Sequence, residues 1–232
     1  MKKLVLSLGL ILALIFFALA AVFIKTFWGG RNPLVMDFIL HPDKHAEWFF
    51  PAKSKCADAP FILPAEGFIG YLWHDSFKLF EAHQGLDIFS GKQAGQSPVY
   101  AAYAGFLTRQ TDWKSTVIIR VPEDPLRPGQ QIWLYMTHLA DAQGNSLIDP
   151  EFPPGTYEKP ILQGQLIGMM GNYSGNPSAP VGVHLHFSIV KDDGHGKYLN
   201  ELKVSNTLNP SPYFGMELDA RKAGKAIPLC KP

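Results

Sequence analysis

The chain has 232 residues, enough for one well-buried domain and a short extension. Its formal net charge of +1 gives no sign of a nucleic-acid-binding surface, so we expect no nucleic-acid partner. Nineteen prolines and 21 glycines favour a mainly β fold made of short strands and turns over one made of long helices.

The chain begins with a long apolar segment. Lys2 and Lys3 precede an almost wholly apolar run from Leu4 to Ile24. This run is long enough for a membrane-spanning helix of roughly 20 residues, and the leading lysines place its start in the cytoplasm. We therefore expect residues 1–25 to form a transmembrane anchor, with the rest of the chain in the cell envelope outside the cytoplasmic membrane. The alternative is a cleaved signal segment and a secreted protein, because Ala18-Leu19-Ala20 resembles a cleavage site.

Residues 26–60 are interpreted as a juxtamembrane linker with aromatic patches. Within it, His41 and His45 have the i,i+4 spacing of a helical metal-binding pair. However, Pro42 lies between them and no carboxylate-rich frame surrounds them, so we expect surface residues.

The two cysteines, Cys56 and Cys230, lie near the start and the end of the exported part. An oxidising compartment permits a disulfide between them, which would tie the C-terminal tail, residues 216–232, to the entrance of the domain. The alternative is a pair of free thiols, and neither cysteine has the spacing of a metal knuckle.

Residues 61–215 have the pattern of a β domain. Short apolar or alternating runs, separated by glycine and proline turns, predict its strands. These runs are Phe68–Trp73, Leu86–Phe89, Val99–Ala102, Thr116–Val121, Ile132–Leu139, Leu166–Met170 and Val183–Ile189.

Two short motifs on these strands carry groups that can bind a metal. In one motif Gly85 permits a sharp backbone path between His83 and Asp87. In the other, His184 and His186 share one face of a strand, roughly 7 Å apart at the backbone, because strand side chains alternate. Two histidines on one face suit a divalent metal, or one metal ligand beside one proton-transfer group. An isolated pair of this kind is more often a pair of surface histidines.

A fifth residue of this type, His138, lies near the end of the strand Ile132–Leu139. A catalytic zinc takes three protein ligands and keeps one position for water. The set of five therefore leaves two histidines for proton transfer and transition-state stabilisation. The spacing alone does not say which histidines these are.

Five ordered blocks resemble the lysostaphin/LytM family of zinc endopeptidases, which cut peptide cross-links in bacterial peptidoglycan. The blocks are His83-Gln84-Gly85-Leu86-Asp87-Ile88, Pro98-Val99-Tyr100-Ala101-Ala102 with Gly105, Tyr135–Leu139, Gly164-Gln165-Leu166-Ile167-Gly168 with Gly171, and His184-Leu185-His186-Phe187. The resemblance implies antiparallel sheets that form a groove, with zinc on its floor and peptidoglycan peptide stems and cross-links as partners. It also implies that His83, Asp87 and His186 bind zinc, while His184 and His138 serve catalysis in roles that could be exchanged.

Two positions depart from the family pattern. Met136 stands two residues before His138, where the family usually has tyrosine, and Tyr135 lies one residue further back. Ser188 follows the His-Leu-His-Phe block, where an acidic residue is common. Neither departure removes a ligand, so both bear on substrate preference more than on chemistry. His74 and His195 lie outside the motif, and we expect them to be solvated.

Two classes of function are compatible with this resemblance. The first is a zinc endopeptidase that hydrolyses peptidoglycan cross-links. The second is a non-catalytic module of the same fold that binds the wall or regulates another hydrolase. In the second class we would expect some metal positions to be lost, whereas all five are present here, which favours the enzyme.

Overall fold

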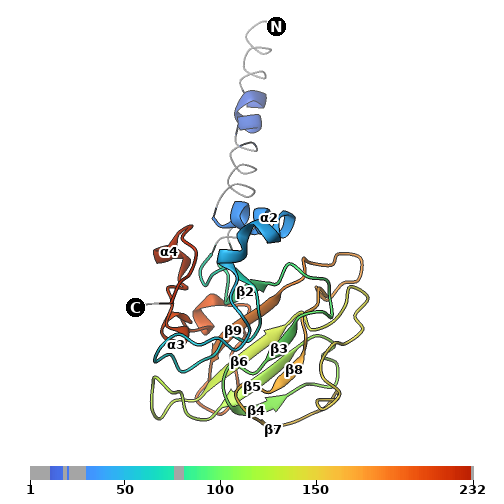
Figure 1. Ribbon diagram of the computed structural model, residues 1–232, viewed down its shortest axis with the longest axis vertical. Coiled ribbons are helices and arrows are strands. Elements are labelled where there is room, and N and C mark those ends of the chain that lie inside the picture. Colours follow the sequence, from blue (N-terminus) through green and yellow to red (C-terminus); the bar gives the residue numbers. More distant parts are fainter. Residues whose placement is uncertain (1–10, 18–19, 21–29, 76–80, 231–232) are drawn as a thin grey trace, which may run out of the picture.

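A computed structural model describes residues 11–17, 20, 30–75 and 81–230 (Figure 1). Its body is a seven-stranded sheet with the strand order β1-β2-β9-β6-β5-β4-β7, in which every neighbouring pair is antiparallel. A second sheet pairs β3 with β8, also antiparallel. The strands are β1 (Phe68–Tyr71), β2 (Leu86–Phe89), β3 (Pro98–Tyr100), β4 (Gly105–Thr108), β5 (Val117–Val121), β6 (Ile132–Thr137), β7 (Lys159–Ile161), β8 (Leu166–Met169) and β9 (Leu185–Lys191). The expected mainly β, antiparallel fold is confirmed.

The core lies on one face of the large sheet. Along β9, Leu185, Phe187 and Ile189 are fully buried in the main apolar cluster, which also contains Val99 of β3 and Ile167 of β8. The small sheet therefore contributes to the same core. Because strand side chains alternate, the opposite face of β9 carries the polar residues of the candidate site.

Apart from the helical residues 11–17, the helices of the described chain are short and lie toward its two ends. They are α2 (Asn32–Leu40), η1 (Pro42–Trp48), η2 (Val204–Asn206), α3 (Ser211–Phe214) and α4 (Ala220–Ala223). In Figure 1, α2 lies beside the end of the sheet that holds β2, and α3 and α4 lie to one side of it.

Residues 30–60 differ from the linker that was expected for residues 26–60, because they pack against the domain. Val35 and Phe38 of α2 are buried with Phe68 of β1 and Phe89 of β2. The fully buried Arg31 donates from Nε to the Gly70 carbonyl at 2.6 Å, and from Nη1 to carbonyl oxygens of the C-terminal tail. This segment is therefore part of the folded unit.

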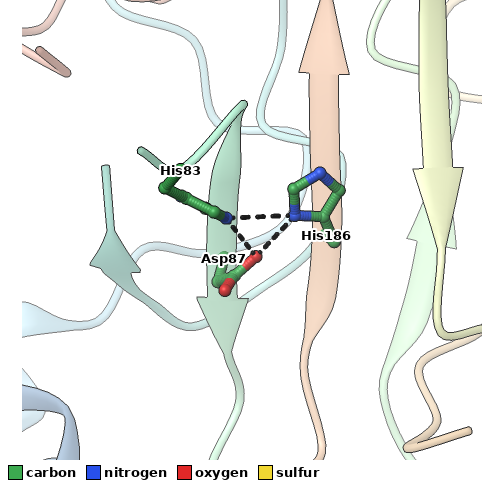
Figure 2. A group of neighbouring side chains, drawn as sticks. All are labelled: His83, Asp87 and His186. Atoms are coloured by element: carbon green, nitrogen blue, oxygen red, sulfur yellow. Dashed lines mark hydrogen bonds and ion pairs between the residues drawn. The ribbon is translucent and has the colours of Figure 1, made fainter. Parts of the chain in front are cut away.

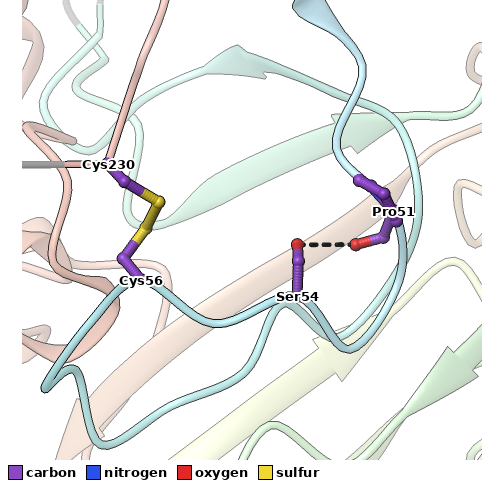
Figure 3. Close-up of a disulfide and its surroundings, with 4 residues drawn as sticks. All are labelled: Pro51, Ser54, Cys56 and Cys230. Carbon is purple, nitrogen blue, oxygen red and sulfur yellow. Dashed lines mark hydrogen bonds between the residues drawn. A yellow bond between two sulfur atoms is a disulfide. The ribbon is translucent and has the colours of Figure 1, made fainter.

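Cys56 and Cys230 form a disulfide, as expected (Figure 3). The link joins the segment before β1 to the end of the described chain. Asp219, just before α4, forms a parallel bridge with Trp73, and Met216 pairs with Cys230 itself. The tail is thus held at several points along its length.

No helix within the described ranges is long and apolar enough to cross a membrane. Residues 11–17 are helical with exposed side chains, but most of the segment Leu4–Ile24 lies outside the described residues. The N-terminal anchor stays a prediction.

Candidate metal centre

Gly85 brings the two residues of the first motif against β9. A Cβ atom at this position would lie 2.1 Å from the carbonyl oxygen of Phe187, so only glycine lets the chain approach β9 so closely. His83 lies just before β2. Asp87 lies within β2 and pairs directly with His186 of β9. The register of β2 on β9 thus places the two motifs side by side.

Figure 2 shows His83, Asp87 and His186 converging on one point. The His83 Nε2 atom is 3.1 Å from Asp87 Oδ1 and 3.1 Å from His186 Nδ1, and His186 Nδ1 is 2.8 Å from Asp87 Oδ1. All three residues are buried, and they form the one group of this kind among the described residues that could hold a metal ion.

Hydrogen bonds at the outward-facing ring nitrogens fix the tautomers of the two histidines. They show which nitrogen of each ring directs a lone pair at the centre of the group. The Nδ1 atom of His83 lies 3.1 Å from the Leu72 carbonyl, and a carbonyl only accepts, so this nitrogen carries the proton. Likewise, Nε2 of His186 lies 2.9 Å from a carboxylate oxygen of Glu201 and donates to it. Two imidazole nitrogens and one carboxylate oxygen therefore point at the same place. Metal-binding histidines typically donate their other N–H in this way.

This arrangement fits zinc. Zn–N and Zn–O bonds of about 2.0–2.1 Å give a tetrahedral ligand–ligand distance of about 3.3 Å, and the three observed separations, 2.8 to 3.1 Å, are a few tenths of an ångström shorter. Two neutral imidazoles and one carboxylate are also a donor set that zinc takes in catalytic sites. His83, Asp87 and His186 would hold the ion.

The electrostatics of the cluster favour positive charge at its centre. Burial lowers the pKa of His186, but hydrogen bonds to Asp87 and Glu201 and the charges of both carboxylates outweigh it and raise the pKa to about 10. For Asp87, burial raises the pKa, but the neighbouring His83 and His184 charges and the hydrogen bonds from His186 and His83 bring it well below the usual range. A proton on Nδ1 of His186 therefore takes the place that a metal cation would fill.

His184 and His138 lie next to this cluster. Their ring centroids are 4.4 Å apart, and His184 Nε2 is 3.8 Å from Asp87 Oδ2. His184 also stacks on Phe89 of β2, with 5.1 Å between the ring centroids. The structure thus brings all five predicted site residues together, whereas their roles stay a prediction.

Both of these histidines have their Nδ1 atoms occupied. Nδ1 of His184 donates to the Gly182 carbonyl at 2.7 Å, and Nδ1 of His138 donates to the Tyr173 carbonyl at 2.7 Å. In the neutral ring Nε2 is then the free acceptor. Burial, the largest cause in each case, lowers the pKa of His184 and lowers that of His138 to about 4. Burial thus favours the neutral form of both rings, in which Nε2 keeps its lone pair.

His138 has an unusual backbone conformation, with φ at 72° in the left-handed region. It is the first residue after β6, so the strand ends at Thr137 and does not continue to Leu139 as expected. Strained residues of this kind persist where surrounding contacts hold them, and they cluster at active sites. One such contact is Gly171, where a Cβ atom would lie 2.7 Å from the carbonyl oxygen of His138 and 2.0 Å from that of Ala140.

Glu201 is a site residue that the sequence reading missed. It lies 15 residues after His186, in the segment between β9 and η2, and no motif or spacing marks it. Tyr135 of β6 begins the third of the five sequence blocks but was given no role, and its ring centroid lies 6.4 Å from that of His186.

The other histidines take no part in the cluster. His195 is exposed, as expected, whereas His74 is only partly exposed and its ring packs edge-on against Trp73. His41 and His45 both hydrogen-bond to Asp37, at 3.2 and 2.9 Å, outside the metal cluster.

A surface cavity of about 500 Å³ lies at the other end of β6 and β9 from His186. Its lining includes Arg127, Ile132, Lys191 and Asp192. It does not touch the cluster, so the groove that was expected around the zinc stays a prediction.

No protein-family model and no curated protein matched the sequence. Solved structures did match. They include LytM from Ruminococcus gnavus, assigned as a glycyl-glycine endopeptidase, at 23% identity and a TM-score of 0.36 over 56% of this chain and 44% of that one. The peptidase lysostaphin from Staphylococcus simulans matches at 21% identity and a TM-score of 0.35, over 65% and 50% of the two chains.

A variant of the catalytic domain of the prophage-encoded protein EnpA from Enterococcus faecalis also matches, at 15% identity and a TM-score of 0.37, over 65% of this chain and 96% of that one. These neighbours are LytM-type peptidases, and the aligned region spans half or less of the first and second of them. A likeness at these TM-scores does not transfer an activity.

Proposed function

We propose that this protein is a zinc-dependent metalloendopeptidase that hydrolyses peptide cross-links of bacterial peptidoglycan. The observation that carries the proposal is the convergence of three metal-binding atoms beside two further histidines. His83 Nε2, His186 Nδ1 and Asp87 Oδ1 all lie within 3.1 Å of one another, and hydrogen bonds fix both imidazoles with a lone pair facing inward.

Zinc bound to these three residues would polarise a peptide carbonyl and lower the pKa of a water molecule. The other steps belong to the protein's own residues. His184 Nε2, beside Asp87, takes the proton of the attacking water and passes it to the leaving amine. The carboxylate of Asp87 stabilises the imidazolium that forms in between.

The ring centroid of His138 lies 4.4 Å from that of His184 and 6.5 Å from that of the ligand His186, and His138 has the second free Nε2 atom. Once protonated, this nitrogen donates a hydrogen bond to the oxygen that becomes negative as the carbonyl turns tetrahedral. Since neutral His138 offers only an acceptor at Nε2, this role requires the imidazolium form. The negative charge that grows on the carbonyl oxygen would have to overcome the burial that lowers the pKa of His138 to about 4. The same geometry permits the two histidines to exchange roles.

The substrate class rests on the five sequence blocks that resemble the lysostaphin/LytM family. Peptidoglycan peptide stems and cross-links are the proposed partners. The proposed location is the cell envelope, with the domain outside the cytoplasmic membrane and anchored to it, or secreted if the N-terminal segment is removed.

The test combines zinc content with digestion of muropeptides. Purified protein is analysed for bound metal, incubated with muropeptides of several wall types, and the products are separated and weighed by mass spectrometry. We expect about one zinc per chain and a product pair whose masses sum to that of the substrate plus one water. Zinc-loaded protein that cleaves none of the wall types would refute the peptidase and favour a wall-binding or regulatory module.

A further inference from the structure

The carboxylate of Glu201 reaches the candidate metal centre from outside the sequence motifs. Its Oε1 atom lies 2.9 Å from His186 Nε2 and 3.2 Å from the hydroxyl oxygen of Ser188. His186 and Ser188 are two residues apart on β9 and therefore share the face that the site occupies. One carboxylate oxygen accepts a hydrogen bond from each of them.

The position of Glu201 is built into the fold. Its side chain is only 9% exposed. The turn that carries it is closed by hydrogen bonds from Leu202 N to Asn200 Oδ1 and from Asn206 Nδ2 to the Asn200 carbonyl. Gln84, next to the ligand His83, also donates to the Leu202 carbonyl at 3.1 Å. The turn is thus tied to both motifs.

We propose that Glu201 is a positioning residue that fixes the ring orientation and tautomer of the metal ligand His186. A carboxylate only accepts hydrogen bonds, so the proton of the neutral ring is held on Nε2 and the lone pair on Nδ1. Nδ1 is the atom that faces Asp87 and His83. The negative charge of Glu201 also makes Nδ1 a stronger donor to a cation.

This role of Glu201 explains how serine can stand at position 188, where an acidic residue is common in the family. The residue at this position points to the same side as His186, so an acidic side chain there could hydrogen-bond to the ligand from within the strand. In this chain Ser188 is a donor and Glu201 is the acceptor. The carboxylate therefore comes from the following loop instead of the strand.

The inference rests on the proposed metal site, so its experiment measures metal binding and the Nε2–H hydrogen bond of His186 rather than peptide cleavage. Zinc affinity is determined by competition with a chromophoric chelator for the wild type, Glu201→Ala and Glu201→Gln. Loss of an outer hydrogen-bond partner typically weakens metal binding about 10- to 100-fold. We expect a loss of that size for Glu201→Ala and a smaller one for Glu201→Gln, whose amide oxygen can still accept the Nε2 proton.

Glu158→Gln is the matched control. Glu158 is also a partly buried glutamate with a hydrogen-bonded partner, Arg120, but it lies next to β7 at the far edge of the sheet. The zinc affinity of the Glu158→Gln variant should equal that of the wild type. Nitrogen-15 NMR of the zinc-loaded protein should show the Nε2–H of His186 in a hydrogen bond in the wild type and without that bond in Glu201→Ala.

Wild-type zinc affinity in both Glu201 variants, with circular dichroism showing them folded, would overturn the proposal. If Glu201→Ala fails to fold, Glu201→Gln decides the question by its zinc affinity, which must then be lower than that of the wild type. Failure of the proposed peptidase gives a different result, because a protein that cuts no muropeptide can still lose zinc affinity on removal of Glu201.

Discussion

Removal of the disulfide between Cys56 and Cys230 should destabilise the protein strongly while leaving the metal centre intact. The two cysteines are 174 residues apart in the sequence. For a loop of that length, the chain-entropy relation gives a stabilisation of about 5 kcal/mol at 25 °C, and loss of a native disulfide typically costs about 2–5 kcal/mol. We therefore expect the free energy of unfolding to fall by an amount in this range.

Loss of the disulfide should act mainly by increasing the conformational entropy of the unfolded chain. In the folded protein the tail keeps other contacts, including hydrogen bonds from Arg31 Nη1 to the carbonyl oxygens of Gly224 and Ala226. Neither cysteine lies on β2 or β9, the strands that carry Asp87 and His186. Zinc affinity at 25 °C should therefore change less than twofold.

The assay is urea denaturation followed by tryptophan fluorescence, on the wild type and on the double variant Cys56→Ala with Cys230→Ala. Alanine is chosen because Cys56 is buried and a serine hydroxyl would need a partner there. Reductant should lower the midpoint of the wild type and leave the double variant unchanged. A wild type whose midpoint does not move, although alkylation and mass measurement show two free thiols, would refute the reasoning.

Two further perturbations test the site and its surroundings. Gly85→Ala places a Cβ atom 2.1 Å from the Phe187 carbonyl oxygen. It should lower the free energy of unfolding by about 3 kcal/mol or more and weaken zinc binding. In the control Gly129→Ala, the Cβ atom meets open space at a φ of 80°, and the free energy of unfolding should fall by only about 1 kcal/mol. Because burial holds the folded-state pKa of His138 at about 4, below its unfolded value of about 6.5, the metal-free wild type should lose up to about 3 kcal/mol of stability as the pH falls between these values. His138→Asn tolerates the left-handed backbone and should lose that part of the pH dependence in urea titrations at pH 7 and pH 4.5; equal pH dependence in both proteins would contradict this.

Local patterns were sufficient to predict much of the sheet. Leu185, Phe187 and Ile189 alternate with polar residues, and in the structure they face the core while His186 and Ser188 face the site. Period-two alternation is a local property of the chain, so it can be recognised in one short stretch.

The contact between the two motifs is not local. Asp87 and His186 are 99 residues apart and meet because β2 pairs with β9 in one register. No spacing rule predicts that register, so the ligand set could be expected only from the order of the five blocks. Glu201 was missed for the same reason, because it contacts His186 through a turn whose position depends on the whole sheet edge.

Residues 30–60 are more ordered in the structure than the sequence predicted. Their composition suggested a linker, yet Arg31 is fully buried and Phe38 packs on Phe68. A buried arginine satisfied by the carbonyl oxygens of Gly70, Gly224 and Ala226 cannot be recognised from the residues around it in the sequence, because its partners come from both ends of the domain.

The most direct test of the proposed function measures zinc content and turnover on the same preparations of the wild type, His186→Ala, His184→Ala and His138→Ala. Loss of one ligand from a three-ligand site should remove both zinc and activity in His186→Ala. His184→Ala and His138→Ala should keep about one zinc per chain, while activity falls about 10²–10⁴-fold for loss of a proton-transfer group and about 10²–10³-fold for loss of an oxyanion donor. Zinc retained in His186→Ala and lost in His184→Ala would contradict the assignment of the ligands.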